Sequence, residues 1–487
     1  MRETKEADLA GGGLERMGLV DGDALARADE VLAEVHARGI ETVRLSFADQ
    51  HGLMRGKTVL ASSLATALRE GIRAPSTVLM KDLSQRTAFP VWSGDAGFGE
   101  GQLTGAGDIL LVPDPASFRV LPWAETTGWI QCDVAATDGG EISFAPRRVL
   151  RKALEDLSEA GYRMTVGLEI EFHVYRVEEA GLDADDIGMP GSPPRVSALT
   201  NSYGLLGEDR ADALDDVAEA LRKATLGLGL PLRSIEHEFG PSQLEFVFDA
   251  GDPLEQADAF ALFRSAAKQV CRRMGLHATF MCQPKVGESA ASGWHLHQSL
   301  SDRTSGVNLF MPADDTSISR EASGWIAGLL EHAPASCLMT TPTVNGYRRF
   351  KAFQMAPDRI QWAVDNRGAM IRGMMRPGDK ASRIENRTPE PAASPHLAIA
   401  SQVAAGLDGL KRGLVAPEPV ENPYAGTVAR LPGTLGDALS AFEASDLYKQ
   451  AFGEAFHGYY STLKRAEWNR YLGTLSDWEQ SEYFSVL

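Results

Sequence analysis

Hydrophobic and polar residues alternate strictly in two runs that lie far apart in the chain, residues 167–175 and 293–300. Successive side chains of a β-strand point to opposite faces, so this pattern predicts two strands, each with one mostly apolar face. The other faces are polar. They carry Glu169, Glu171, His173 and Tyr175 on the first strand, and His295, His297 and Ser299 on the second. Acidic and imidazole side chains on strand faces indicate a metal site.

Other segments follow the period of an α-helix. Apolar residues recur at helical spacing over residues 146–160, and Gly161 supplies a stop signal. Residues 212–226 and 253–274 predict two further helices, each leading into a strand that carries acidic residues or histidine. The chain after residue 397 is mainly helical. This order predicts α/β or α+β architecture, with helices outside and a sheet whose inner face is polar.

The beginning of the chain predicts a separate, β-rich domain. Residues 42–47 and 54–59 form two short strand-like runs around a polar turn. Residues 1–22 contain three consecutive glycines and scattered charges, a composition typical of a flexible tail. We therefore expect a tail over 1–22, an N-terminal domain over 23–125 and a larger domain over 126–487.

Composition narrows the class of protein. The 487 residues are 44% hydrophobic with a formal net charge of -18, which favours small-molecule ligands over nucleic acid or an anionic membrane surface. The four cysteines have no paired spacing, so neither a zinc cluster nor a disulfide framework is expected. The N-terminus lacks an apolar signal region, and no stretch approaches the ~20 apolar residues that span a bilayer. The expected location is the cytoplasm.

Three more carboxylates extend the candidate metal site. Glu238 and Glu245 flank a tight Gly240-Pro241 turn between two predicted strands, and Glu385 lies in a further alternating run. The inventory is then five carboxylates and one or two histidines, without a thiolate. Hard divalent cations that prefer oxygen ligands, Mg²⁺ or Mn²⁺, suit this set better than zinc does.

A basic cluster accompanies these acids within an otherwise acidic chain. Its members are Arg348, Arg349, Arg367, Arg372, Lys380, Arg383 and Arg387. Guanidinium groups beside metal-binding carboxylates suit phosphoryl transfer, in which charge develops on several phosphate oxygens. A nucleoside triphosphate is the natural co-substrate. No GxxxxGK[ST] loop is present, so ATP would be held by arginines and metal ions.

Each of these signals alone is weak, because acidic strand faces and arginine-rich stretches are usually solvated surface. Their order and spacing together, however, resemble the glutamine synthetase superfamily over nearly the whole chain. The resemblance rests on six motifs, at residues 167–172, 238–245, 295–300, 345–349, 366–372 and 383–395. It implies an α+β fold, with a small β-grasp N-terminal domain and a catalytic domain with a curved antiparallel sheet and outer helices. It also implies a homododecamer of two hexameric rings, with active sites between subunits.

The resemblance also implies a role for each motif. Glu171, Glu238 and Glu245 would hold one metal ion, and Glu169, His295 and Glu385 another, with two or three Mg²⁺ or Mn²⁺ ions per site. Arg349 and Arg387 would bind the substrate carboxylate, and Arg367 and Arg372 would stabilise the transferred phosphoryl group. His297, Ser299, Lys380 and Arg383 would contact ATP. Asp82 is the best match to an aspartate donated across the subunit interface. In the implied reaction, ATP phosphorylates the γ-carboxylate of L-glutamate, and an amine then displaces phosphate.

The chain departs from the family pattern near the expected amine. Ammonia-using members carry a flap glutamate six residues after the arginine equivalent to Arg349, and Met355 stands there in this sequence. The family's Asn-Gly-Ser-Gly segment reads Ala-Ala-Ser-Gly over residues 290–293. The C-terminal segment resembles the γ-glutamylpolyamine synthetase branch. These departures indicate a substituted amine instead of ammonia.

Charge narrows the choice of amine further. An alkylamine arrives protonated and needs carboxylates, whereas an arylamine is neutral at pH 7 and needs only an apolar slot. Ala291, Trp294, Phe353 and Met355 would furnish such a slot, which favours a hydrophobic or aromatic amine, as in a γ-glutamylanilide synthetase. The alternatives are a γ-glutamylpolyamine or other alkylamine ligase, an ammonia-using glutamine synthetase and a catalytically silent homologue.

Overall fold

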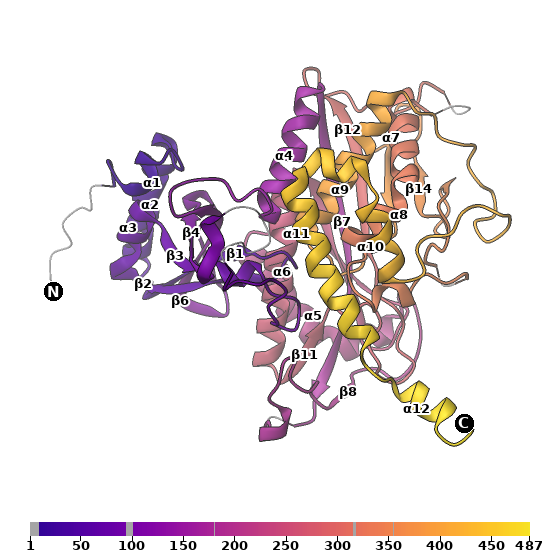
Figure 1. The fold of residues 1–487 in the computed structure, drawn as a ribbon, viewed down its shortest axis with the longest axis horizontal. Helices are drawn as coiled ribbons and strands as arrows, with labels where there is room; N and C mark the ends of the chain where they lie inside the picture. The colour runs from indigo at the N-terminus through magenta and orange to yellow at the C-terminus, as the bar shows by residue number, and fades with distance from the viewer. Residues whose placement is uncertain (1–8, 94–100, 180, 315–317, 354) are drawn as a thin grey trace.

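A computed structural model describes residues 9–93, 101–179, 181–314, 318–353 and 355–487. It contains two β-sheets, one in a small N-terminal domain and one in a larger domain that carries most of the helices (Figure 1). The predicted α+β class is confirmed. Within the described ranges, no helix combines the length and apolar composition that crossing a membrane requires.

The N-terminal sheet is built around the predicted strand–turn–strand unit. Its six strands follow the order β2-β1-β6-β4-β3, with β5 paired to β6. The strands are β1 (Thr42–Ala48), β2 (Met54–Leu60), β3 (Ile72–Pro75), β4 (Asp108–Pro113), β5 (Arg119–Leu121) and β6 (Ala124–Ala136), and the helices are α1 (Gly13–Arg16), α2 (Gly22–Ala37) and α3 (Ala61–Glu70). Because β6 pairs with both β1 and β4, the expected domain boundary at 125/126 falls inside a strand, and the N-terminal sheet continues to Ala136.

Residues 9–20, which composition predicted to be part of a tail, pack against this sheet. Leu14 of α1 is fully buried with Leu110, Val112 and Ala135. The apolar side chains in this short segment therefore outweigh the flexibility that its three glycines suggested.

The larger domain is built on a nine-stranded sheet. Its main path is β13-β14-β15-β12-β7-β10-β9, with β8 and β11 paired to β7. Its pairs are antiparallel except for β13 with β14, which run parallel at one edge. The strands are β7 (Tyr162–Val177), β8 (Val196–Ala198), β9 (Leu232–His237), β10 (Gln243–Gly251), β11 (Leu276–Thr279), β12 (Trp294–Asp302), β13 (Trp362–Val364), β14 (Ile371–Met374) and β15 (Arg383–Asn386).

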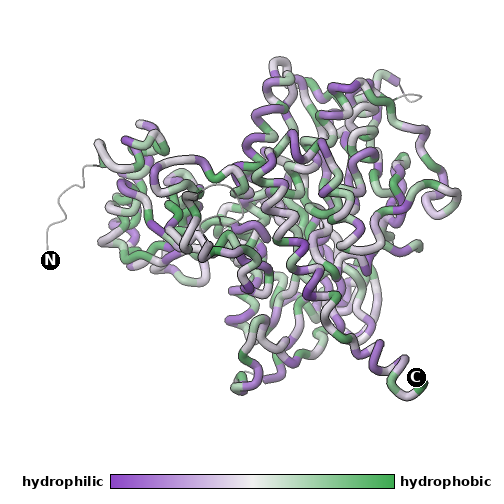
Figure 2. Tube along the Cα trace, in the orientation of Figure 1, coloured by the Kyte–Doolittle hydropathy of each residue, from purple (hydrophilic) through white to green (hydrophobic). Residues whose placement is uncertain are grey.

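Helices cover one face of this sheet and bury its apolar side chains. The helices of this domain are α4 (Pro146–Glu159), α5 (Glu208–Gly227), α6 (Pro253–Arg273), α7 (Arg320–Glu331), α8 (Ala333–Thr340), α9 (Pro395–Arg412), α10 (Leu435–Glu443), α11 (Asp446–Leu472) and α12 (Asp477–Tyr483), of which α12 has no buried residue and takes no part in this cover. Phe172 of β7 packs against Phe246 of β10 and Phe263 of α6. The hydropathy of α4 changes repeatedly along its length, as expected of a helix with one buried side (Figure 2). The even-numbered side chains of β7 thus face the helices, which leaves the odd-numbered acids on the other face.

A buried arginine on α6 ties the two domains together. The Arg264 guanidinium on α6 donates to the carbonyls of His51 and Gly52 in the β1–β2 turn, at 2.9 and 2.6 Å. It also donates to the carbonyls of Pro391 and Ala393, at 3.0 and 3.1 Å. The N-terminal hairpin is therefore fixed to the segment that follows β15.

Candidate active site

Strands β7 and β12 pair so that the two alternating runs of the sequence form one polar surface. His295 lies opposite Glu169 in this antiparallel register. His295 Nδ1 is 3.1 Å from Glu169 Oε2, and His297 Nε2 is 2.9 Å from Glu169 Oε1. Each oxygen of one carboxylate is thus engaged by a different imidazole.

Neighbouring strands bring the remaining acids to the same surface. Glu245 of β10 lies opposite Glu171, and Glu385 of β15 lies opposite His297. Potential ligand atoms lie within 4.8 Å of one another in two groups, Glu169 with His297 and Glu385, and Glu169 with Glu245 and His295. The geometry therefore places His297 among the potential metal ligands, whereas the family resemblance gave it an ATP contact.

The buried acids need a cation to balance their charge. Burial and the nearby Glu238 raise the pKa of Glu171 to about 8. Burial and the neighbouring acids, Glu171 first among them, raise the pKa of Glu245 well above its usual range. Burial lowers the pKa of His295 to about 4, with Arg387 adding to the effect, so this imidazole is neutral and able to bind a metal. A set of carboxylate oxygens and neutral imidazole fits Mg²⁺ or Mn²⁺.

Metal binding should consequently strengthen as pH rises. The metal-free fold holds a proton on Glu171 up to about pH 8, whereas an unfolded glutamate releases it near 4.5. The contribution of this bound proton to the free energy of unfolding is fully present below pH 4.5 and is lost as the pH rises toward 8. A divalent cation can replace the proton at that pH. We expect Mn²⁺ affinity at least about tenfold weaker at pH 6 than at pH 8, and a smaller metal-induced rise in melting temperature.

Mn²⁺ titration and thermal unfolding of chelator-treated enzyme at both pH values would measure this effect. Glu171→Gln is the control, because its amide does not titrate, and the dependence on pH should weaken to the part that Glu245 contributes. Equal Mn²⁺ affinity of the wild-type enzyme at pH 6 and pH 8 would contradict the prediction.

Two arginines donate to Glu385, whose side chain is completely buried. Arg387 donates to its Oε1, and Arg372 Nη1 donates to its Oε2 at 3.2 Å. Arg349 is also buried, and its guanidinium donates to the carbonyl of Arg387 at 2.8 Å. Burial would raise the pKa of Glu385, but Arg387 and the nearby histidines outweigh it and keep the group ionised. Arg387, predicted to bind carboxylate, and Arg372, predicted to stabilise phosphate, therefore meet at one anchored acid.

The residues expected to contact phosphate and ATP lie farther toward solvent. Arg383 Nε is 3.1 Å from His297 Nδ1, and Ser299 lies two residues beyond His297 on β12. Arg367 and Lys380 are exposed. Arg383 is thus joined to the carboxylate and histidine cluster through His297, whereas the phosphate and ATP contacts of Ser299, Arg367 and Lys380 stay predictions.

The expected amine slot is brought together only in part. Phe353 and Met355 are 78% and 55% exposed, and the carbonyl of Met355 accepts from Arg387 Nη2 at 3.1 Å. The Phe353 ring lies 4.6 Å from that of Tyr424, which the sequence did not single out. Ala291 is half-buried beside the cluster, with its carbonyl accepting from Gln243 at 3.3 Å.

Trp294 lies on the other face of the sheet from these residues. Its ring is completely buried against Phe260 of α6, with ring centroids 4.9 Å apart. Strand alternation dictates this outcome, because the neighbouring His295 points to the polar face. The sheet therefore separates Trp294 from the expected amine slot, a position that disagrees with its predicted role.

Comparison with known proteins identifies the family. The model of the glutamine synthetase catalytic domain matches residues 143–483. The chain belongs to the glutamine synthetase family. A γ-glutamylanilide synthase of Acinetobacter sp. is 42% identical over 94% of this chain and 96% of its own length. The γ-glutamylethanolamide synthetase GlnA4 of Streptomyces coelicolor is 32% identical over 98% and 99%. The structure of a GmaS/ADP complex matches with a TM-score of 0.78 and 28% identity, over 93% of this chain and 99% of the other.

Membership of the glutamine synthetase family makes this chain an ATP-dependent carbon–nitrogen ligase of the glutamate–amine type. The predicted resemblance to the glutamine synthetase superfamily is confirmed, together with the fold that it implied. Enzymes of this family use ATP and divalent metal ions, which agrees with the carboxylate and histidine groups described above.

Asp82, the predicted cross-subunit residue of this family member, is engaged within its own chain. Its buried carboxylate accepts from Arg470 of α11 and from the backbone N–H of Arg86, the latter at 3.0 Å. The contact with Arg470 connects the N-terminal domain to α11. The predicted contribution to a neighbouring subunit's site stays a prediction.

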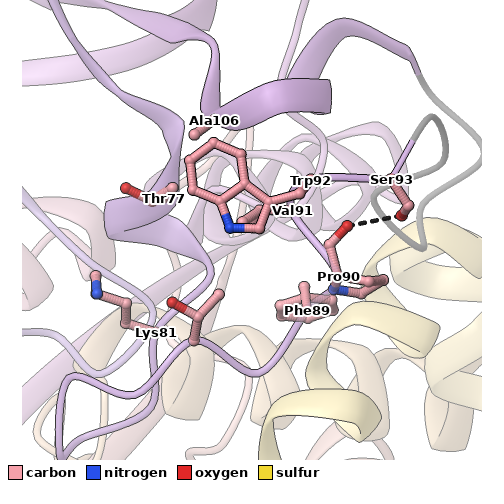
Figure 3. A pocket seen from close by; sticks show the side chains of 9 residues that line it. Thr77, Lys81, Phe89, Pro90, Val91, Trp92, Ser93 and Ala106 are labelled. Carbon is pink, nitrogen blue, oxygen red and sulfur yellow. Dashed lines mark hydrogen bonds between the residues drawn. The ribbon is translucent and has the colours of Figure 1, made fainter.

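A hollow of about 620 Å³ lies beside this segment of the N-terminal domain (Figure 3). It is lined by Thr77, Lys81, Thr87, Phe89, Pro90, Val91, Trp92, Ser93 and Ala106. The Trp92 ring is 82% exposed. The lining contains neither an acid nor a histidine, so this hollow is chemically unlike the carboxylate cluster and is not the active site of the ligase.

Proposed function

We propose that this ligase joins a hydrophobic or aromatic amine to the γ-carboxylate of L-glutamate through a γ-glutamyl phosphate. One observation carries the proposal: the uncharged Met355, with an exposed side chain, is held through its carbonyl by the buried Arg387. The ammonia-using branch is expected to carry an acid at this place. The γ-glutamylanilide synthase among the similar proteins supports the same choice of amine.

The first step is phosphoryl transfer. A γ-carboxylate oxygen of glutamate attacks the γ-phosphorus of ATP, and ADP leaves. Arg349 and Arg387 would orient the substrate carboxylate, while Arg367 and Arg372 neutralise charge on the phosphoryl oxygens. Divalent cations held by the carboxylate and histidine cluster would supply the positive charge that ATP needs there.

The second step forms the amide bond. The amine nitrogen attacks the acyl carbon of γ-glutamyl phosphate, the C–O bond to phosphate breaks, and the nitrogen releases one proton to the departing phosphate or to water. An arylamine is already neutral at pH 7, so this attack needs no carboxylate in the flap to accept a proton from the amine first. Phe353, Met355 and Tyr424 would instead exclude water from the acyl phosphate and cover the ring of the amine.

A panel of amines tests the proposal directly. Phosphate release would be followed with L-glutamate, ATP and Mg²⁺ in the presence of aniline, isopropylamine, ethanolamine, putrescine or ammonia. We expect aniline to give a kcat/KM at least about tenfold above the others, since the flap offers apolar surface and no counter-ion. Preferential use of putrescine or ammonia would refute the aromatic substrate while leaving the ligase activity intact.

A matched pair of variants separates charge from polarity at the flap. Met355→Glu should lower kcat/KM for aniline about tenfold and raise it for a protonated alkylamine, because the new carboxylate attracts a cation and disfavours an apolar ring. Met355→Gln changes size and polarity as Met355→Glu does but adds no charge, so it should not favour the alkylamine. Identical amine profiles for the two variants would mean that charge at this position does not select the substrate.

An alkylamine is the second candidate for the substrate. The similarity to GlnA4, together with a C-terminal segment resembling the polyamine branch, favours it. For either amine we infer a homododecamer of two hexameric rings with active sites between subunits. Light scattering coupled to size exclusion would measure that mass.

A further inference from the structure

His173, like Tyr175, is a residue of the polar face of the first alternating run for which the proposed reaction has no use. It lies two residues beyond Glu171 on β7 and is completely buried. Within the described chain, the groups of ligand atoms close enough to hold a metal include neither His173 nor Glu171, and the metal role of Glu171 rests on the family resemblance. Burial alone lowers the pKa of His173 to about 4, so the ring is neutral at pH 7. Among the described residues its Nε2 has no hydrogen-bond partner, and the one partner of its Nδ1 leads back to Glu171.

A chain of buried polar groups connects His173 to that carboxylate. His173 Nδ1 is 3.2 Å from Ser292 Oγ. Gln243 Nε2 donates to Ser292 Oγ at 3.0 Å and to Glu171 Oε2 at 3.2 Å. The orientation of the Gln243 amide is fixed at its other end, where Oε1 accepts from the N–H of Gly240 at 2.9 Å. Since Ser292 Oγ already accepts a proton from Gln243, its own proton is free for His173 Nδ1.

This chain determines which oxygen of Glu171 remains available. Glu171 Oε2 accepts from the N–H of Gly293 at 2.7 Å as well as from Gln243. Glu171 Oε1 points the other way, 3.5 Å from Nε2 of His295. One oxygen is therefore occupied by protein donors, and the other faces the cluster.

We propose that His173 is a positioning residue which, through Ser292 and Gln243, holds Glu171 so that it offers only Oε1 to a divalent cation. Without an acceptor at position 173, the Ser292 hydroxyl would turn its proton toward another buried group and disturb Gln243. Outer partners of metal ligands typically contribute about 10–100-fold to metal affinity by this kind of orientation. The inference rests on the metal role proposed for Glu171.

A purely structural role makes a different prediction. The His173 ring stacks on Tyr175, with ring centroids 5.8 Å apart and an angle of 7° between the ring planes. If His173 only fills space, an apolar ring of similar size should bind metal normally, whatever it does to thermal stability. Mn²⁺ affinity, measured on chelator-treated enzyme by the electron paramagnetic resonance of free Mn²⁺, distinguishes the two roles.

His173→Phe should weaken Mn²⁺ binding about 10–100-fold and raise the apparent KM for Mg²⁺ in the same proportion. His173→Asn should recover Mn²⁺ affinity to within about threefold of wild type, because its side-chain oxygen can accept from Ser292 near the place of Nδ1. Tyr175→Phe is the matched control on the same strand face and should bind Mn²⁺ as wild type does.

Ser292→Ala removes only a hydroxyl and decides the question if His173→Phe fails to fold. It should weaken Mn²⁺ binding as His173→Phe does, and the double variant should be no weaker than either, because both changes break one chain. Wild-type Mn²⁺ affinity in His173→Phe would overturn the positioning role of His173 but not the metal role of Glu171. If His173→Phe is unfolded, wild-type Mn²⁺ affinity in Ser292→Ala would do the same. Failure of the wild-type enzyme to bind Mn²⁺ would overturn the metal role of Glu171, and this inference with it.

Discussion

Replacing Glu385 with glutamine should lower ligase activity at least about a hundredfold under saturating substrates. Its carboxylate is completely buried, accepts from Arg387 and Arg372, and lies 3.8 Å from His295 Nδ1. The amide keeps the shape but removes the negative charge that two arginines and a candidate metal site share. Phosphate release at saturating Mg²⁺ measures the loss.

The same substitution should also destabilise the fold, by about 3 kcal/mol, because the buried Arg387 keeps its charge and loses its counter-ion, while Arg372 retains Asp365. Denaturant unfolding would record this change in free energy. Glu331→Gln is the matched control, since Glu331 also lies near a histidine and an aspartate but is exposed and pairs with Arg412 at the surface. Wild-type activity in Glu385→Gln would exclude this carboxylate from the catalytic cluster.

Gly293→Ala should reduce kcat/KM about a hundredfold through a displacement of the site. A Cβ atom there would lie 2.5 Å from Arg349 Nη2 and 3.0 Å from His295 Nε2. Arg349 cannot easily yield, because its guanidinium is buried and donates to the carbonyls of Arg387 and Thr388. The added methyl group therefore moves a predicted substrate ligand, a candidate metal ligand, or both.

Gly167→Ala provides the control for this substitution. Gly167 lies on the same face of β7 as Glu169, but a Cβ there would be 3.5 Å from the nearest atom, Cβ of His297, which is ordinary van der Waals contact. We expect activity within about threefold of wild type. Steady-state rates of both variants with varied L-glutamate would show a raised KM only for Gly293→Ala, and equal kinetics for the two would contradict the steric argument.

Strand periodicity accounts for most of the site that could be predicted. A period of two placed Glu169, Glu171, His295 and His297 on polar faces, and backbone pairing then set one strand beside the other. The same period indicates that Trp294 points away from the site, although the residue is adjacent to His295 in the sequence. The period of two also places Gln243, two residues before Glu245, on the same strand face as that carboxylate.

Long-range packing accounts for what could not be predicted. Tyr424 reaches Phe353 from the segment between α9 and α10, and neither charge nor period marks it in the sequence. Similarly, nothing local reveals that β6 pairs in parallel with β1, and the expected domain boundary consequently divided that strand. Composition also failed for residues 9–20, where a single leucine, Leu14, anchors the segment.

The division between strands and loops has an evolutionary consequence. The candidate metal ligands lie on paired strands or directly beside them, where an insertion or deletion would shift every later side chain to the wrong face. Phe353, Met355 and Tyr424 lie outside the strands, where changes of length and composition are tolerated. A lineage can therefore acquire a new amine by altering these loops while it inherits the ATP-dependent activation of glutamate unchanged.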